Sequence, residues 1–457
     1  MLRVLLLTVV LFVFIIGGAR AQTQPDLIEA LSGYPELSTL VALLEQAELV
    51  SALASAEAVT IFAPTNEAFA AFSPAVLSYL NANPDLLARI LAYHAVPGAL
   101  DSAAVLAESS LPTLADEALE VNAALGRING ALLLEADIRA ENAIIHIING
   151  VMLPTISLPP ADALISVEPI RAGGSSTVRP LTERIRDLFE REGFAGSITV
   201  DENGTTVGFE RFCVNGEIDI ANASRRIRSA EVEACRANGI EPVEFFIAVD
   251  ALAVTVSRDN DFIQSLTREQ LAQIFTGAFT TWDQVDPAYP AEPIRVYSPG
   301  ADSGTFNYFV EAVVGRGLNL NAADAEAALL ASEVVQFSED DNVLVQGVEN
   351  NPFAIGYFGY AYYIANQERL RTVAVDGIEP NEATAESGAY PLARPLFIYS
   401  SPSIMQAKPQ VAQFINFYIN TAGSQLGTEP RQIGYFPVNR DILNLDRLEW
   451  LAAMAAE

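Results

Sequence analysis

The sequence is poor in the residues from which metal and redox sites are built. The 457 residues include only two cysteines and two histidines, and no repeated Asp-x-Asp-x-Asp spacing of the kind found in calcium loops. Zinc and calcium sites require several such ligands close together. We therefore expect no metal site and no cofactor.

Basic residues are also scarce. Lysine and arginine together number 26 against 57 acidic residues, which gives a formal net charge of -31. This balance argues against nucleic acid and anionic membrane surfaces as partners. Half of the residues are nevertheless apolar, so the charge decorates folded domains, and the length suggests roughly two to four of them.

The motifs of nucleotide-binding and hydrolytic enzymes are missing as well. The glycine-rich stretches "GGSST" and "NGTTVG" lack the Gly-Lys-Ser/Thr of a P-loop and the spacing of a dinucleotide fingerprint. Ser176 and Ser303 have no candidate base, because both histidines lie in the N-terminal region. We expect a binding protein and no enzyme.

The N-terminus has the layout of a signal peptide. Arg3 precedes an apolar run from Val4 to Ile16, and Ala19-Arg20-Ala21 offers a cleavage site. We assign residues 1–21 to this segment and expect an extracytoplasmic protein, either periplasmic or secreted to the cell surface, with no lipid-anchor cysteine. In that setting Cys213 and Cys235 are expected to form a disulfide.

Residues 25–156 and 166–457 differ in character, and the Pro-Pro stretch 157–165 between them suits a linker. The first region contains "VTIFAPTNEAFAAF", which predicts a strand, a turn and a helix with Thr65 or Asn66 as N-cap. "AYHAVPG" follows, and "AIIHIINGVMLP" predicts a closing strand and an Asn-Gly turn.

These three segments, in this order, resemble the fasciclin-like domain. The resemblance implies a small α+β fold, a role in extracellular adhesion or scaffolding, and partner binding through the segment that contains Tyr93 and His94. The alternative is that Tyr93 and His94 only lock a turn in the core by hydrogen bonds.

The second region alternates predicted strands and helices, which favours an α/β fold. Four predicted strands end in small hydroxylated or glycine-rich turns. The turns contain Ser175, Ser176 and Thr177; Thr205; Ser224; and Ser303, Gly304 and Thr305. Each turn alone could be a helix cap. Together, at the carboxyl ends of strands, their N–H groups and hydroxyls are suited to hold an anion.

The segments "GGSSTVRPLTE", "YSPGADSGTFNYFVEAV" and "YPLARPLFIY" resemble the phosphate-binding subunit of the phosphate ABC transporter. The resemblance implies the periplasmic-binding-protein fold, in which two α/β lobes close over an oxyanion. Lobe 1 would comprise about 166–256 and 377–457, and lobe 2 about 257–376. The strands in "IAVDALAVTV" and "YPLARPLFIYS" would cross between the lobes.

The resemblance places the phosphate-binding residues in the four turns described above, with two departures. Ser224 stands where many members carry an aspartate, and Pro299 stands where many carry an arginine. We expect Arg225 to supply the missing cation and Asp302 the proton acceptor, with Arg226 as the fallback cation. The alternative for both arginines is a solvated basic turn.

The sequence therefore predicts an exported, monomeric protein that captures inorganic phosphate for an ABC permease. Its fasciclin-like module would bind an extracellular protein or matrix partner. The alternatives are sulfate as ligand, or an adhesion or scaffold protein whose second domain is vestigial.

Overall fold

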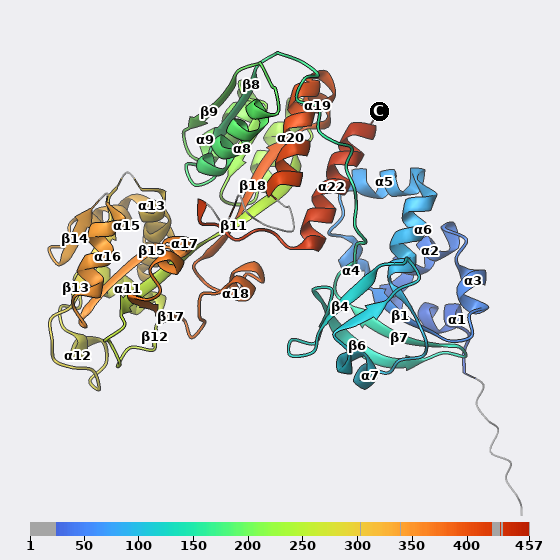
Figure 1. Cartoon of the computed structure of the whole chain (residues 1–457), viewed down its shortest axis with the longest axis horizontal. Helices are drawn as coiled ribbons and strands as arrows, with labels where there is room; N and C mark the ends of the chain where they lie inside the picture. Colours follow the sequence, from blue (N-terminus) through green and yellow to red (C-terminus); the bar gives the residue numbers. More distant parts are fainter. Residues whose placement is uncertain (1–23, 302, 339, 423–429, 431–432, 457) are drawn as a thin grey trace, which may run out of the picture. The chain divides into compact units, whose positions relative to one another are not determined.

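The computed structural model describes residues 24–301, 303–338, 340–422, 430 and 433–456, which form two compact units (Figure 1). The N-terminal unit contains the residues up to Ala71 together with Pro84–Met152, and the C-terminal unit contains Phe72–Asn83 together with Leu153 onward. The expected signal peptide lies outside the described residues. Within these residues, no helix combines the length and the apolar character needed to cross a bilayer.

The N-terminal unit is an α+β domain around one seven-stranded sheet of order β2-β1-β7-β6-β5-β4-β3. Its strands are β1 (Val59–Pro64), β2 (Ala95–Pro97), β3 (Ser110–Pro112), β4 (Ala118–Asn122), β5 (Arg127–Ile128), β6 (Ala131–Arg139) and β7 (Ala143–Ile148). Its helices are α1 (Leu27–Ser32), η1 (Pro35–Leu37), α2 (Ser38–Gln46), α3 (Val50–Ala54), α4 (Asn66–Phe69), α6 (Pro84–Tyr93) and α7 (Ser102–Ala107).

The local predictions for this unit are confirmed. β1 and β7 are both buried along their length and pair in parallel as interior strands of the sheet. Thr65 is the N-cap of α4, since its hydroxyl accepts a hydrogen bond from the Ala68 N–H at 3.2 Å. Asn66 instead ties this turn to the preceding helices, where its side chain accepts from the Thr39 N–H at 2.9 Å.

The C-terminal unit is built on a nine-stranded sheet whose order is β14-β13-β15-β11-β18-β10-β8-β9, with β16 paired to β11. The first lobe contains β8 (Ile170–Gly174), α8 (Arg179–Arg191), β9 (Ile198–Glu202), α9 (Thr205–Glu210), the π-helical segment η2 (Arg211–Asn215), β10 (Ile220–Ala223), α10 (Ser229–Ala237), β18 (Ala393–Ser400), α19 (Pro402–Ala407), α20 (Pro409–Ala422) and α22 (Arg440–Ala455).

The second lobe contains the described elements after α10 that are not named above, apart from β11. They are β12 (Ser265–Leu266), α11 (Arg268–Phe275), α12 (Trp282–Val285), β13 (Arg295–Pro299), α13 (Gly304–Phe309), the π-helical segment η3 (Val310–Gly315), α14 (Arg316–Leu318), α15 (Ala322–Leu330), β14 (Val335–Ser338), α16 (Asp341–Glu349), β15 (Ala354–Gly359), α17 (Tyr360–Ala365), β16 (Leu370–Thr372), β17 (Ala374–Val375) and α18 (Glu382–Glu386). The second lobe includes α18, because Ala385 packs in the core of this lobe, although the expected boundary placed residues 377–457 in lobe 1.

The strand β11 (Val243–Ser257) belongs to both lobes and appears in Figure 1 as the long strand that runs from one to the other. Its first part pairs antiparallel with β18, from Val243↔Ser400 to Ala251↔Ala393. Its second part pairs with β15, from Leu252↔Gly359 to Val256↔Ile355. The run is almost entirely apolar because a central strand is covered on both faces. The α/β character and the crossing strands expected from the sequence are therefore present.

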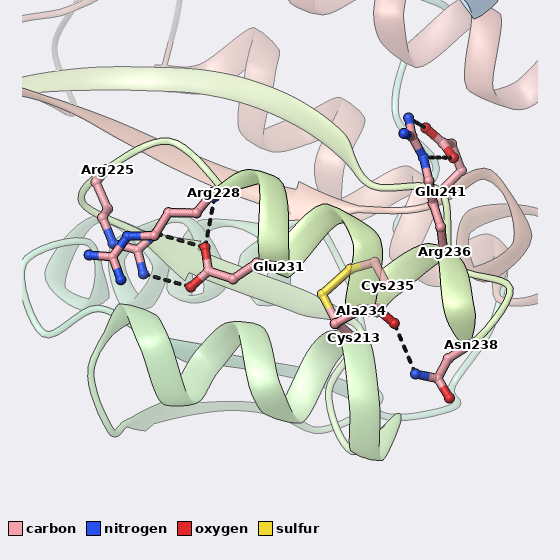
Figure 2. Close-up of a disulfide and its surroundings, with 9 residues drawn as sticks. All are labelled: Cys213, Arg225, Arg228, Glu231, Ala234, Cys235, Arg236, Asn238 and Glu241. Carbon is pink, nitrogen blue, oxygen red and sulfur yellow. Dashed lines mark hydrogen bonds and ion pairs between the residues drawn. A yellow bond between two sulfur atoms is a disulfide. The ribbon is translucent and has the colours of Figure 1, made fainter.

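A disulfide joins Cys213 of η2 to Cys235 of α10, as predicted (Figure 2). Both residues are buried in a small core that includes Phe212 and Tyr399. The bond closes a loop of 22 residues and fixes α10 against the segment that follows the second glycine-rich turn. It therefore holds together two of the chain segments that carry the polar turns.

Replacing both cysteines by serine is expected to lower the free energy of unfolding of the C-terminal unit by about 3 kcal/mol, the chain-entropy value for a loop of this length. Urea unfolding of the oxidised parent and of the Cys213→Ser/Cys235→Ser variant measures the difference. Two free thiols in the parent, titrated under denaturing conditions without reductant, would contradict the assignment.

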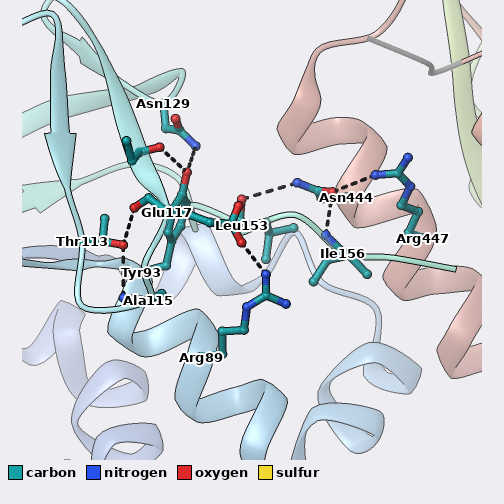
Figure 3. Close-up of polar contacts among 11 residues, drawn as sticks. Arg89, Tyr93, Thr113, Ala115, Glu117, Asn129, Leu153, Ile156, Asn444 and Arg447 are labelled. Carbon is teal, nitrogen blue, oxygen red and sulfur yellow. Dashed lines mark hydrogen bonds and ion pairs between the residues drawn. The ribbon is translucent and has the colours of Figure 1, made fainter.

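The first residues after the N-terminal unit are tied into the C-terminal unit by Asn444 of α22 (Figure 3). The Asn444 side chain is buried, accepts a hydrogen bond from the Ile156 N–H at 3.0 Å, and donates to the Leu153 carbonyl at 3.4 Å. The helix α5 (Pro74–Ala82) also packs along α22, where the Ser73 hydroxyl donates to the Glu449 carboxylate at 2.8 Å. Segments on both sides of the predicted linker thus complete this unit.

A chain that begins at Leu153 should be more stable than one that begins at Ser166. Both chains lack α5. The shorter chain also loses the two hydrogen bonds of the Asn444 amide to the Ile156 N–H and the Leu153 carbonyl, which should lower its free energy of unfolding by about 1–3 kcal/mol. Urea unfolding of the two chains compares them directly. Equal midpoints would show that residues 153–165 add nothing to the C-terminal unit.

Candidate functional site

Three parallel strands of the first lobe end at one edge of the sheet. β8 lies between β9 and β10 and pairs in parallel with both, so their carboxyl ends are adjacent. Each strand is followed by one of the polar turns expected from the sequence. The order of strands therefore brings the first three turns together.

The backbone at the end of β8 requires glycine. Gly174 has a φ of +130°, and a Cβ at this position would lie 2.3 Å from the Asn222 carbonyl oxygen of β10. The close approach lets the Ser175 N–H donate to that same carbonyl at 2.9 Å. Ser175 and Thr177 are buried in the turn that leads into α8, so the Ser-Ser-Thr segment is held at the N-terminal end of a long helix.

The second and third turns are hydrogen bonded to each other. The Thr205 hydroxyl, at the start of α9, accepts from the Ser224 N–H at 3.2 Å and lies 3.2 Å from the Ser224 hydroxyl. Ser224 follows β10 directly. Two side chains from different turns thus share one polar cluster on the same rim.

The fourth turn comes from the second lobe. The Ser303 hydroxyl accepts from the Thr305 N–H at 3.2 Å and caps α13. A Cβ on Gly304 would lie 3.7 Å from both the Ser176 and the Thr177 hydroxyl oxygens. Turns of the two lobes therefore face each other at contact distance. Asp302, the expected proton acceptor, lies outside the described residues.

Two adjoining cavities, of about 530 and about 740 Å³, open beside these turns. The larger cavity is lined by residues of all four turns, including Thr205 and Ser224, and the smaller is lined by Thr305 and Tyr435 among others. Four residues line both cavities: Ser176, Thr177, Gly304 and Arg394. The polar turns of the two lobes meet at this junction.

Arg225 lines the larger cavity, but its guanidinium is engaged by Glu231 (Figure 2). The two nitrogens Nη1 and Nη2 donate to the carboxylate at 2.8 and 2.7 Å, and Nη2 also donates to the Thr206 hydroxyl at 3.1 Å. Burial alone would raise the pKa of Glu231, but the hydrogen bonds from Arg225 and from the Arg228 N–H lower it below the usual range. The Glu231 carboxylate is therefore ionised at neutral pH and holds the Arg225 guanidinium in place.

Sequence reasoning missed the pair formed by Arg394 and Asp250. These residues face each other across the crossing strands β18 and β11, and the Arg394 Nε donates to the Asp250 carboxylate at 3.0 Å. Both side chains line the smaller cavity and are largely buried, with exposed fractions of 12% and 9%. A charged residue in the apolar run "IAVDALAVTV" was the available signal, since a buried carboxylate requires a partner.

Comparison with known proteins places this geometry in a family. The PBP superfamily domain matches residues 158–421, and the fasciclin domain matches residues 35–154. The first match covers more than half of the chain. The chain belongs to the PBP superfamily. A fasciclin domain precedes its PBP domain, as the two sequence resemblances indicated.

Named relatives of the PBP domain are similar over most of their length. Protein SphX of Synechococcus elongatus is 42% identical over 279 residues, which cover 59% of this chain and 77% of SphX. The phosphate-binding protein PstS of Staphylococcus saprophyticus is 35% identical over 259 residues, covering 56% of this chain and 76% of PstS. A crystal structure of a possible phosphate binding protein from Planctomyces limnophilus aligns with a TM-score of 0.56 and 33% identity, over 63% of this chain and all of that one.

One of these relatives, PstS, is named as a phosphate-binding protein. Among the described residues, no group of three or more histidine, cysteine, aspartate or glutamate side chains is arranged to hold a metal ion. The polar turns offer donors for a ligand, and the PBP domain itself supplies no imidazole to act on the hydroxyls of Ser176 and Ser303, because both histidines of the chain, His94 and His146, belong to the fasciclin domain. The arrangement is suited to binding.

Tyr93 and His94 of the fasciclin domain are buried in its interior. The Tyr93 hydroxyl donates to the Ala118 carbonyl at 3.1 Å (Figure 3). His94 Nδ1 lies 2.8 Å from the Ile90 carbonyl, and Nε2 accepts from the Met152 N–H at 2.9 Å. These contacts favour the interpretation in which the pair locks the core of the domain.

Acidification should destabilise the fasciclin domain through His94. Burial lowers the pKa of His94 from 6.5 to about 4, with the Ile90 hydrogen bond acting in the opposite direction. The folded state thus keeps the ring neutral while the unfolded chain takes up a proton. The stabilisation is complete above about pH 6.5 and is lost as the pH falls toward 4, by at most about 3 kcal/mol.

NMR titration of the full chain gives the His94 pKa directly, and urea unfolding at pH 7.5 and 5.0 gives its effect on stability. The variant His94→Gln should show a weaker dependence on pH than the parent. A titration midpoint of His94 near 6.5, or an unchanged pH dependence in His94→Gln, would contradict the assignment.

Proposed function

We propose that this protein is an exported solute-binding protein that captures inorganic phosphate between the two lobes of its PBP domain and delivers it to an ABC permease. The observation that carries the proposal is the convergence of hydroxyl-bearing turns from both lobes at the junction of two cavities. The similarity to PstS supports it, because PstS is named as a phosphate-binding protein.

The chemistry of the turns suits a tetrahedral oxyanion. Backbone N–H groups and hydroxyls are donors whose geometry matches several oxygens at once, and they need no net positive charge. The proposed ligands are Ser175, Ser176, Thr177, Thr205, Ser224, Arg225, Asp302, Ser303, Gly304 and Thr305. The cavities are far larger than one oxyanion, so we infer that the lobes close when the anion binds.

Calorimetric titration of the mature chain should show one phosphate bound per molecule and much weaker binding of sulfate. Sulfate carries no proton at neutral pH, so a site that contains a carboxylate acceptor leaves that acceptor opposed to a second anion. Equal affinities for the two anions would exclude phosphate as the selected ligand. A lack of heat with either anion would exclude the proposed function.

The variant Thr305→Val tests the turn of the second lobe. It removes one hydroxyl from the cavity wall while keeping the shape of the side chain, and losing a hydrogen bond to an anion should weaken phosphate binding by about tenfold or more. Thr276→Val is the matched control in the same lobe, because the Thr276 hydroxyl donates to the Ala272 carbonyl at the end of α11. Equal affinity in the two variants would remove Thr305 from the site.

The fasciclin domain is the observation that favours a second function, adhesion to an extracellular protein or matrix. Since Tyr93 and His94 are buried, such a partner would contact other residues of the domain. We infer that the whole chain acts as a monomer outside the cytoplasm. Deleting residues 22–152 should leave phosphate affinity unchanged and abolish attachment to the cell surface or matrix, which a sedimentation assay with whole cells measures.

A further inference from the structure

Arg394 differs from the other arginines of the cleft in its position and in the burial of its side chain. Of the four residues that line both cavities, three belong to the polar turns and the fourth is Arg394. Its side chain is 12% exposed, compared with 25% for Arg225, 70% for Arg226 and 58% for Arg316, which also line the larger cavity. It is therefore the most shielded of these four cations.

Arg394 lies on the crossing strand β18, and its side chain contacts the other crossing strand, β11, and a residue of each lobe. Its Nε donates to Asp250 on β11, and its Nη2 donates to the Thr177 hydroxyl of the first turn at 2.6 Å. The guanidinium also lies over the ring of Tyr308 of α13, 3.9 Å from the ring centroid. The side chain is thus held in one orientation, which reduces the entropy that a ligand would have to remove.

This arrangement leaves part of the guanidinium available. An arginine has five N–H donors, and among the described residues none accepts a hydrogen bond from Nη1 of Arg394. In contrast, both terminal nitrogens of Arg225 are committed to the carboxylate of Glu231. Arg394 therefore has a terminal nitrogen to offer beside Thr177, whereas Arg225 would have to break an ion pair to offer either of its terminal nitrogens.

We propose that Arg394, in place of Arg225, is the cation that binds the phosphate in the cleft and that Asp250, in place of Asp302, is the carboxylate that selects phosphate over sulfate. This inference rests on the proposed function. It supplies the positive charge that the sequence lacks at Pro299, and it takes that charge from the crossing strand β18 instead of from a loop. The anion would lie against Thr177 and the guanidinium, at the junction of the two cavities.

Asp250 gives the pair its selectivity. Its side chain is 9% exposed, and one carboxylate oxygen accepts from Arg394, so the other can accept the proton of a protonated oxyanion. Phosphate retains a proton at neutral pH, and sulfate does not. Sulfate would therefore bring a negative charge against a shielded carboxylate with no hydrogen bond in return.

Calorimetric titration of the full mature chain with inorganic phosphate and with sulfate tests both roles. Arg394→Gln should weaken phosphate binding by at least about thirtyfold, as expected when one partner of a shielded charge pair is removed. Arg394→Lys should recover only part of this loss, because an ammonium lacks the planar fork of a guanidinium. Asp250→Asn should reduce the ratio of phosphate to sulfate affinity at least about tenfold, because an amide can donate to sulfate.

The matched control is Arg236→Gln, which removes an arginine of the first lobe that is 60% exposed and lines neither cavity, and should leave both affinities within about twofold. Urea unfolding without anion, measured on each variant, separates a structural role from a binding role. Phosphate affinity unchanged in Arg394→Gln, or an unchanged ratio in Asp250→Asn, would overturn the inference while the parent still binds phosphate. A parent that binds neither anion would overturn the proposed function as well.

Discussion

The pairing of β11 with β18 and β15 is the constraint on which the PBP domain depends. One strand of 15 residues is hydrogen bonded to a first-lobe strand over its first part and to a second-lobe strand over its second. Each lobe therefore packs its own helices on a different stretch of the same strand. β8 and β10 run in the same direction as β11, and β13 runs in the opposite direction, so their carboxyl ends point toward the middle of β11 from the two lobes. The polar turns that follow these strands therefore converge.

An acidic protein can bind an anion because the groups that contact the anion act on it more strongly than the distant surface charges do. The net charge of -31 is spread over the surface, where salt limits its reach to about 8 Å at physiological ionic strength. The donors of the turns and the guanidinium of Arg394 act at contact distance. Within the larger cavity the acids Glu311 and Glu326 are accompanied by several arginines, including Arg225 and Arg316, so the sign of the charge inside the cleft differs from that of the whole molecule.

Features that depend on neighbouring residues could be predicted from the sequence. The cap at Thr65, the disulfide and the strand-turn-helix pattern around Ser176 each involve short stretches whose residue types fix the local geometry. The pairing of Asp250 with Arg394 could not be predicted, since it joins residues 144 apart and depends on the register of two strands. The same limit applies to the ion pair of Arg225 with Glu231, which forms only once α10 has folded beside the turn.

The location of Arg394 also bears on how binding could be coupled to closure. A ligand shifts an equilibrium between open and closed lobes only through contacts that differ between the two states. Arg394 stands on the crossing strand, touches Thr177 of the first lobe and lies over Tyr308 of the second. An anion bound at its guanidinium would attract the N–H groups of both turns toward one point, whereas a cation on either outer rim would favour only its own lobe. Because Arg394 stands on a crossing strand, one small ligand bound to its guanidinium would act on both lobes.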